Sequence, residues 1–271
     1  MRVEVIRSTD SPERYICQMA RGDMSSSYIG DIEYTELMEP VDYSERDLEA
    51  VKALKSFEDG RSEQFWIDEA KTRAFLRKEA SRGHWGIWEH PSIGFAVENM
   101  SVVTERQVTR HRHLSFDIQS MRYVDFSGEK PYATPASLTD PEHKTRGEGL
   151  IWYDMESETP IEEQDPDVKA MENAHHVYEK ALKNSSKAYN AMRDLGVPKE
   201  DARYALPLGT QVNVGMSGNA RSFLHVLNLR SRGDAQWEIQ DLSDEIVAEL
   251  REWIPYTCEW WDEKGPVQIS P

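Results

Sequence analysis

The sequence contains little cysteine and no long apolar segment, and each shortage excludes a class of protein. Only Cys17 and Cys258 occur among 271 residues, far apart and without a CxxC pair, so a disulfide framework or thiolate metal site has little support. No apolar run is long enough for a membrane helix, and the N-terminal "MRVEVIRSTD" alternates like a short strand instead of resembling a signal peptide. We therefore expect a soluble cytoplasmic protein that does not associate with membranes.

Positive charge is also scarce. Asp and Glu number 49 against 32 Lys and Arg, which gives a formal net charge of -17 and a sequence pI near 4.9. A surface of this sign repels a phosphate backbone, so general binding to nucleic acid is not expected. The same acidic excess is typical of proteins adapted to high salt and of ordinary acidic cytosolic proteins, and the composition fits both.

The usual local motifs for dinucleotides and metals are missing as well. There is no GxGxxG segment and no Walker loop, so a bound dinucleotide would have to be held by side chains. The eight histidines match no HExxH or paired zinc pattern, and no metal site is expected. A zinc-dependent hydrolase has only the number of histidines in its favour.

The chain does contain enough large apolar side chains to fold, with 8 Trp, 11 Tyr and 7 Phe. Its length lies near the limit for one hydrophobic core, and we predict a single elaborated domain over residues 1–271. Periodicity and capping signals predict strands at 1–10 and 92–100 and helices at 45–57, 62–83, 102–112, 167–195, 199–207, 219–231 and 235–254. Residues 125–167 are rich in Pro, Gly and acidic residues, which indicates a long loop or insertion, either a lid or a solvated excursion.

The scarce positive charge is concentrated in "RHRHLSFDIQSMRY", residues 110–123. If the helix that Ser101 caps continues through this motif, Gln107, Arg110 and His111 share one face. Such a face suits an anionic planar ligand, because arginine grips phosphate in a fork. The alternative is a solvated basic helix end that complements the helix dipole.

A second basic segment, "NARSFLHVLNLR", places Arg221 and His225 four residues apart on a predicted helix with mostly apolar neighbours. Arginines in this setting are costly to bury without a partner. Arg221 and Arg230 are therefore expected either to extend to the surface or to meet an anion in a pocket.

These segments resemble the flavin-dependent thymidylate synthases. "RHRHLSFDIQSMRY" is similar to the signature of that family, RHR followed by seven residues and a serine. "HWGIWEH" at 84–90, "ARYALP" at 202–207 and "NARSFLHVLNLRSRGDAQWEIQ" at 219–240 resemble its other segments in the same order. The resemblance covers about residues 84 to 245.

The resemblance implies an α+β subunit, with a twisted antiparallel sheet flanked by long helices, that assembles into a homotetramer with shared active sites. It implies that bound FAD takes part in the reductive methylation of dUMP to dTMP, with 5,10-methylenetetrahydrofolate as carbon donor and NADPH as reductant. The alternative is a non-catalytic nucleotide-binding relative of the same fold, because Asp117 and Ile118 stand where the family often has Asn and Glu.

Carried over by position, the resemblance assigns two sets of residues. Arg230 is expected to stabilise the charge that develops on the uracil, and Ser120 to position dUMP without acting as nucleophile, since no general base is visible beside it. Gly86 and Ile118 could contact a ligand through the backbone only. The residues expected to contact FAD are Gly86, Glu89, Arg110, His111, Arg112, Asn219, Ala220, Arg221 and His225; those expected to hold dUMP are Gln107, Val108, Thr109, Arg110, Ile118, Gln119, Ser120, Met121, Arg122, Arg203 and Arg230.

Overall fold

The structure is a computed structural model that describes residues 1–22, 25–26, 28–55, 61–128, 132–139, 152–156, 159–161, 171–265 and 269. The chain forms two compact units. The first consists of Met1–Val97, Val108–Asp117 and Gly215–Pro271, and the second of Glu98–Gln107 and Ile118–Val214. The single domain expected over residues 1–271 stays a prediction.

Helices and antiparallel strands are combined in the fold, as an α+β class requires. A four-stranded sheet has the order β1-β2-β7-β3, formed by β1 (Arg2–Ser8), β2 (Ser92–Ser101), β7 (Gln211–Asn219) and β3 (Ser115–Ile118). A second sheet pairs β4 (Trp152–Asp154) in antiparallel fashion with β5 (Thr159–Ile161) and with β6 (Met171–Asn173). The predicted strands at 1–10 and 92–100 are thereby confirmed.

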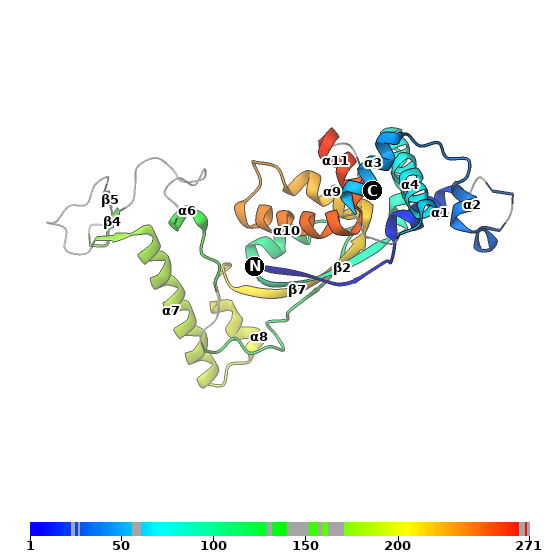
Figure 1. The fold of residues 1–271 in the computed structure, drawn as a ribbon. Helices are drawn as coiled ribbons and strands as arrows, with labels where there is room; N and C mark the ends of the chain where they lie inside the picture. The colour runs from blue at the N-terminus through cyan, green and yellow to red at the C-terminus, as the bar shows by residue number, and fades with distance from the viewer. Residues whose placement is uncertain are drawn as a thin grey trace. The chain divides into compact units, whose positions relative to one another are not determined.

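The first unit contains helices α1 (Pro12–Gly22), α2 (Tyr34–Met38), α3 (Glu45–Leu54), α4 (Glu63–Ser81), α9 (Ala220–Arg230), α10 (Trp237–Trp253) and α11 (Pro255–Lys264), with short 3-10 turns at Ile29–Asp31 and Trp85–Glu89. Helix α3 packs on α4, α11 on α4 and α10, and α10 on α9 and β1 (Figure 1). The Trp85 ring lies 4.8 Å from that of Trp88 and 5.3 Å from that of Trp260, so the short turn at Trp85–Glu89 is anchored in the core.

Local capping signals explain most helix bounds in this unit. Ser44 and Asp47 form a capping box at the start of α3. The Ser62 hydroxyl accepts from the Phe65 N–H at 3.1 Å at the start of α4, and Gly83 follows its end with φ of +76°. The helices predicted at 45–57, 62–83, 219–231 and 235–254 are confirmed, with ends that shift by a few residues.

The second unit contains α6 (Ala136–Thr139), α7 (Ala174–Asp194), α8 (Lys199–Ala202) and a 3-10 turn at Arg203–Ala205, together with most of α5 (Val102–Val108). The Ser101 hydroxyl accepts from the Thr104 N–H at 3.1 Å and so caps α5 as predicted. The start predicted for the long helix at 167 is wrong. Residues Met171–Asn173 are an extended strand, and the Asn173 side chain accepts from the His176 N–H at 2.9 Å, so α7 begins at Ala174.

The predicted loop at 125–167 includes α6, β4 and β5 among its described residues. Residues 129–131, 140–151, 157–158 and 162–167 of this segment, which was predicted to be either a lid or a solvated excursion, lie outside the described residues. Within the described part of the chain, no helix has the length and apolar character needed to cross a membrane.

Candidate active site

The RHR motif forms a tight turn instead of the last turn of a helix. Helix α5 ends at Val108, whose carbonyl accepts from the His111 N–H at 3.0 Å, and the His111 carbonyl accepts from the Leu114 N–H at 3.0 Å. This turn buries His111 and Leu114 while Arg110 and Arg112 stay exposed. The predicted helical face shared by Gln107, Arg110 and His111 is therefore wrong, because burial of the imidazole and the leucine turns the chain before β3.

Helix α9 supplies the other wall of the site. It begins after Asn219, whose side-chain oxygen accepts from the Ser222 N–H at 2.8 Å, and the Ala220 N–H donates to the carbonyl of Pro91 at 3.2 Å. Ser222, Val226 and Arg230 then lie four residues apart on one stripe of α9, with His225 beside Val226, and Arg230 follows Val226 by four residues as the sequence predicted.

The turn and the stripe enclose a cavity of about 260 Å³, here called the arginine–histidine cavity. Among the residues that the structure describes, its lining contains three arginines and three histidines and no carboxylate, in a chain of net charge -17. The local potential is thus opposite in sign to the charge of the whole chain, and it favours an anion. The lining residues are Arg110, His111, Arg112, His113, Leu114, Ser222, His225, Val226, Leu229 and Arg230.

His111 and Arg230 are joined directly in this cavity. The Arg230 Nε–H donates to His111 Nε2 at 3.0 Å, and the His225 ring lies 6.2 Å from the His111 ring at an angle of 77°. Burial lowers the pKa of His111 to about 4, helped by the nearby charges of Arg230, His225 and His113. The imidazole is neutral near pH 7, with its proton on Nδ1, because Nε2 accepts the bond from Arg230.

Arg221 contacts a carboxylate instead of the cavity. Its Nη1 lies 2.6 Å from Glu89 Oε1, and its Nε–H donates to the carbonyl of Ile269 at 3.2 Å. Glu89 belongs to the same 3-10 turn as Gly86, which is exposed and has open space where a Cβ would lie. Two predicted flavin contacts, Glu89 and Arg221, are thus paired with one another.

Several residues predicted to hold dUMP belong to the second unit. The Gln119 N–H donates to the carbonyl of Asn213 at 2.8 Å, and Gln119 Oε1 accepts from the Asn213 N–H at 3.1 Å. The Ser120 hydroxyl accepts from the Arg122 N–H at 3.2 Å. Within the described residues no side-chain base is hydrogen-bonded to Ser120.

Glu200 connects two predicted substrate arginines in the second unit. Its Oε2 lies 2.6 Å from Arg122 Nε, and its main-chain carbonyl accepts from Arg203 Nε at 2.9 Å. The sequence reasoning missed Glu200, although its place three residues before Arg203 in "KEDARYALP" was a usable signal. It also missed His113, which lines the arginine–histidine cavity and follows the RHR triplet directly.

The remaining predicted residues are divided between the units. Val108 and Thr109 join α5 to the turn in the first unit, whereas Gln107, Ile118 and Met121 belong to the second. Val108 is buried, and Ile118 is 38% exposed.

Comparison with known proteins identifies the family of the chain. Residues 4–256 match the family model described as thymidylate synthase complementing protein. A flavin-dependent thymidylate synthase of Halobacterium salinarum is 35% identical over 270 residues, which cover 97% of this chain and 95% of that protein. The chain belongs to the flavin-dependent thymidylate synthase family.

Two further comparisons agree with this membership. The flavin-dependent thymidylate synthase of Haloarcula marismortui is 32% identical over 272 residues, covering 97% of this chain and 96% of that protein. The crystal structure of a UMP/dUMP methylase, PolB from Streptomyces cacaoi bound with 5-Br dUMP, has the same fold. Its TM-score is 0.65 at 22% identity, over 98% of this chain and 96% of that one. Membership makes the chain an enzyme of the methyltransferase class and a flavoprotein.

The arginine–histidine cavity fits the anionic ligands of a flavoenzyme. Its arginines can bind phosphate or a polarised carbonyl, and no carboxylate among the described lining residues opposes them. At about 260 Å³ the cavity is smaller than the roughly 300–1,000 Å³ usual for small-molecule sites. It therefore accommodates one part of a dinucleotide or nucleotide, and the other parts need further residues.

Proposed function

We propose that this chain catalyses the reductive methylation of dUMP to dTMP, with FAD as cofactor, 5,10-methylenetetrahydrofolate as carbon donor and NADPH as reductant. The observation that carries the proposal is the arginine–histidine cavity, which is built from two segments that match the family and has no carboxylate among its described lining residues. All four ligands are anionic and carry planar rings, which suits arginine and imidazole side chains.

In this proposal Arg230 acts on the pyrimidine and His111 positions Arg230. A guanidinium near the uracil N3 and O2 edge stabilises the negative charge that develops when the ring is polarised for methyl transfer. Neutral His111 accepts the Nε–H of Arg230 at 3.0 Å and fixes the direction of the guanidinium. When bound, the flavin supplies the hydride that the reductive step requires.

The phosphate of dUMP is assigned to Arg122 and Arg203. Glu200 contacts Arg122 through its carboxylate and Arg203 through its carbonyl, and it thereby holds both guanidinium groups of this pair. The hydroxyl of Ser120 accepts from the Arg122 N–H, which fixes the start of the turn that carries Arg122. These contacts support roles for Ser120 and Glu200 in positioning the substrate-binding arginines.

We also propose that the chain assembles into a homotetramer and works in the cytoplasm. Large apolar side chains are exposed on the single chain, among them Ile6 at 65%, Leu195 at 84% and Tyr204 at 86%. Burying such side chains against another chain would remove apolar area from water and so favour association. Light scattering on the purified protein measures the assembly, and a monomer at working concentration would contradict it.

Absorbance spectroscopy provides the first test of the function. We expect the purified chain, incubated with FAD and desalted, to retain the flavin bands, and we expect dUMP to perturb them. A colourless protein after this treatment contradicts the proposal. Retained flavin that responds to dUMP without any product would favour the non-catalytic relative, for which Asp117 and Ile118 remain the sequence argument.

A further inference from the structure

Ser222 lines the arginine–histidine cavity, and the family resemblance assigns it to no ligand. It lies in the first turn of α9, on the same stripe as Val226 and Arg230, and it is 2% exposed. Its backbone N–H takes part in the helix cap, where it donates to the Asn219 side chain at 2.8 Å. Its hydroxyl is not used in that cap.

The Ser222 hydroxyl is buried and has no hydrogen-bond partner among the residues that the structure describes. A buried hydroxyl without a partner is unfavourable, because it has lost water and gained nothing in its place. Ser243, equally buried on α10, avoids this by donating to the carbonyl of Ile239 at 2.7 Å. Ser222 does not use the corresponding carbonyl of Gly218, so contacts within the described fold do not explain its hydroxyl.

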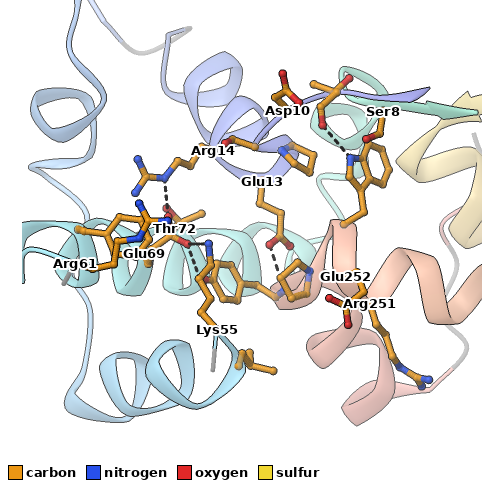
Figure 2. Close-up of a pocket in the computed structure, with 18 residues that line it drawn as sticks. Ser8, Asp10, Glu13, Arg14, Lys55, Arg61, Glu69, Thr72, Arg251 and Glu252 are labelled. Atoms are coloured by element: carbon orange, nitrogen blue, oxygen red, sulfur yellow. Dashed lines mark hydrogen bonds and ion pairs between the residues drawn. The ribbon is translucent and has the colours of Figure 1, made fainter. Parts of the chain in front are cut away.

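A larger cavity, of about 960 Å³, provides a contrast. It lies between the start of α1, the first half of α4 and the junction of α10 with α11 (Figure 2). Its described lining residues include equal numbers of carboxyl groups and cations. The buried carboxylate of Glu69 lies 2.6 Å from both Arg14 Nε and Lys55 Nζ, as Figure 2 shows. The charges around Glu69 are therefore paired within the protein, whereas the Ser222 hydroxyl is not.

The arginine–histidine cavity changes in character from its buried end to its rim. Its buried lining residues are His111, Leu114, Ser222 and Val226, and its exposed ones are Arg110, Arg112, His113 and Leu229. An aliphatic wall with a few polar groups suits a planar ring, whereas arginines at the rim suit phosphate. We therefore expect a ring at the buried end, beside Ser222.

The hydroxyl of Ser222 offers this ring what the arginines do not. A guanidinium only donates hydrogen bonds, whereas a hydroxyl donates and accepts. An imide edge, C(=O)–NH–C(=O), presents two acceptors on either side of one donor, so it can bond to a hydroxyl in both directions. No hydrogen bond within the described residues holds Oγ, so rotation about the Cα–Cβ bond can turn it toward such an edge.

We propose that the Ser222 hydroxyl binds the imide edge of a planar ring in the arginine–histidine cavity, either the uracil of dUMP or the isoalloxazine of FAD. Both rings carry this edge, and the inference rests on the proposed function, since the proposed reaction brings both to the chain. The hydroxyl is then unfavourable in the empty protein and favourable in the complex. A serine with a purely structural role has no such difference between the two states.

Ser222→Ala tests this difference on the full chain, because it removes the hydroxyl without adding bulk. FAD is titrated by flavin fluorescence, and dUMP is titrated by calorimetry into the chain saturated with FAD. We expect the dissociation constant of one of the two ligands to rise about three- to tenfold, as for loss of one neutral hydrogen bond. Weaker FAD binding identifies the isoalloxazine, and weaker dUMP binding alone identifies the uracil.

Ser243→Ala is the matched control, because it removes an equally buried hydroxyl that is bonded within the protein. It should leave the affinities for FAD and dUMP unchanged. Both variants gain the helix propensity of alanine, but only Ser243→Ala loses a hydrogen bond. Without ligands, Ser222→Ala should therefore have the higher melting temperature of the two.

ADP supplies a second control, since it carries the adenosine and the pyrophosphate of FAD without the isoalloxazine. Ser222→Ala and wild type should bind ADP equally, as measured by competition with FAD. A loss for ADP as large as the loss for FAD would overturn the inference, because the hydroxyl would then contact phosphate or adenosine.

Two other results would overturn the inference alone and leave the proposed function to the thymidylate assay. The first is equal affinity of Ser222→Ala and wild type for both FAD and dUMP. The second is a melting temperature of ligand-free Ser222→Ala no higher than that of Ser243→Ala, which would show that the hydroxyl has a partner in the fold. A wild-type chain that binds neither FAD nor dUMP would overturn the inference and the proposed function together.

Discussion

At the scale of single residues, the central contact of the proposed active site is the bond from Arg230 to His111. Each residue sets a property of the other: the imidazole orients the guanidinium, and the guanidinium helps to lower the pKa of the imidazole. The two residues are 119 positions apart in the sequence. The sequence predicted both as site residues through the family motifs, but no local spacing could predict that they touch.

Replacing Arg230 tests whether its charge acts on the substrate. We expect Arg230→Ala to abolish thymidylate formation and to leave most of the flavin bound, because His111 and the other flavin-binding candidates remain. Thymidylate is measured by chromatography and bound flavin by absorbance. Arg230→Lys keeps a positive charge but not the Nε–H geometry, so intermediate activity is expected. Loss of flavin in proportion to activity would instead place Arg230 at the cofactor.

The lowered pKa of His111 predicts a loss of stability in acid. The folded chain keeps this imidazole neutral down to about pH 4, whereas an unfolded chain protonates it near the ordinary value of 6.5. The stabilisation is complete above pH 6.5 and is lost progressively as the pH falls from 6.5 to about 4. Urea unfolding between pH 4 and 7 should therefore show a shallower pH dependence for His111→Gln than for wild type. His176→Gln, at an exposed position on α7, serves as control, and identical curves for His111→Gln and wild type would contradict the account.

At the scale of elements, the helix ends decide how the site is presented. Ser44, Ser101 and Gly83 act as the sequence indicated, because caps depend on neighbouring residues. The predicted C-terminal end of α5 and the predicted start of α7 were wrong, because they depend on the burial of His111 and on the pairing of β6 with β4. The local sequence therefore predicted the helix ends that are set by hydrogen bonds between neighbouring residues. It did not predict the helix ends that are set by contacts between distant parts of the chain.

The cap of α9 offers a matched test of its role in the site. Asn219 and Asn173 accept the same kind of bond at the starts of α9 and α7, at 2.8 Å and 2.9 Å. We expect Asn219→Ala and Asn173→Ala each to lower the free energy of unfolding by about 1 kcal/mol. Only Asn219→Ala should also weaken the binding of FAD, which is measured by titration of flavin fluorescence. Equal FAD affinity in the two variants would remove Asn219 from the flavin site.

At the scale of the whole molecule, the chain combines a strongly negative net charge with local clusters of positive side chains. The net charge of -17 belongs to the chain as a whole, whereas six of its 32 Lys and Arg residues lie in two groups, three in the arginine–histidine cavity and three around Phe65. Composition predicted the acidic surface, and the family motif predicted the first cluster. Of the second cluster, only Arg61 is local to Phe65, four residues before it, whereas Arg14 and Lys55 reach the ring from other elements.

The acidic surface predicts that salt stabilises the chain. Like charges repel one another in the folded state, and added salt shortens the Debye length from about 10 Å at 0.1 M to about 3 Å at 1 M. We expect the melting temperature to rise as potassium chloride is increased over this range. Loss of the fold at low salt would support adaptation to high salt, whereas a melting temperature indifferent to salt would contradict both the repulsion and that adaptation.

The most direct test of the central claim is thymidylate formation by the purified chain from dUMP, 5,10-methylenetetrahydrofolate and NADPH, measured with and without added FAD. The account predicts dTMP in an FAD-dependent reaction, together with one NADPH oxidised for each dTMP, and no product from Arg230→Ala. A wild-type chain that binds FAD and dUMP yet forms no dTMP would contradict the account.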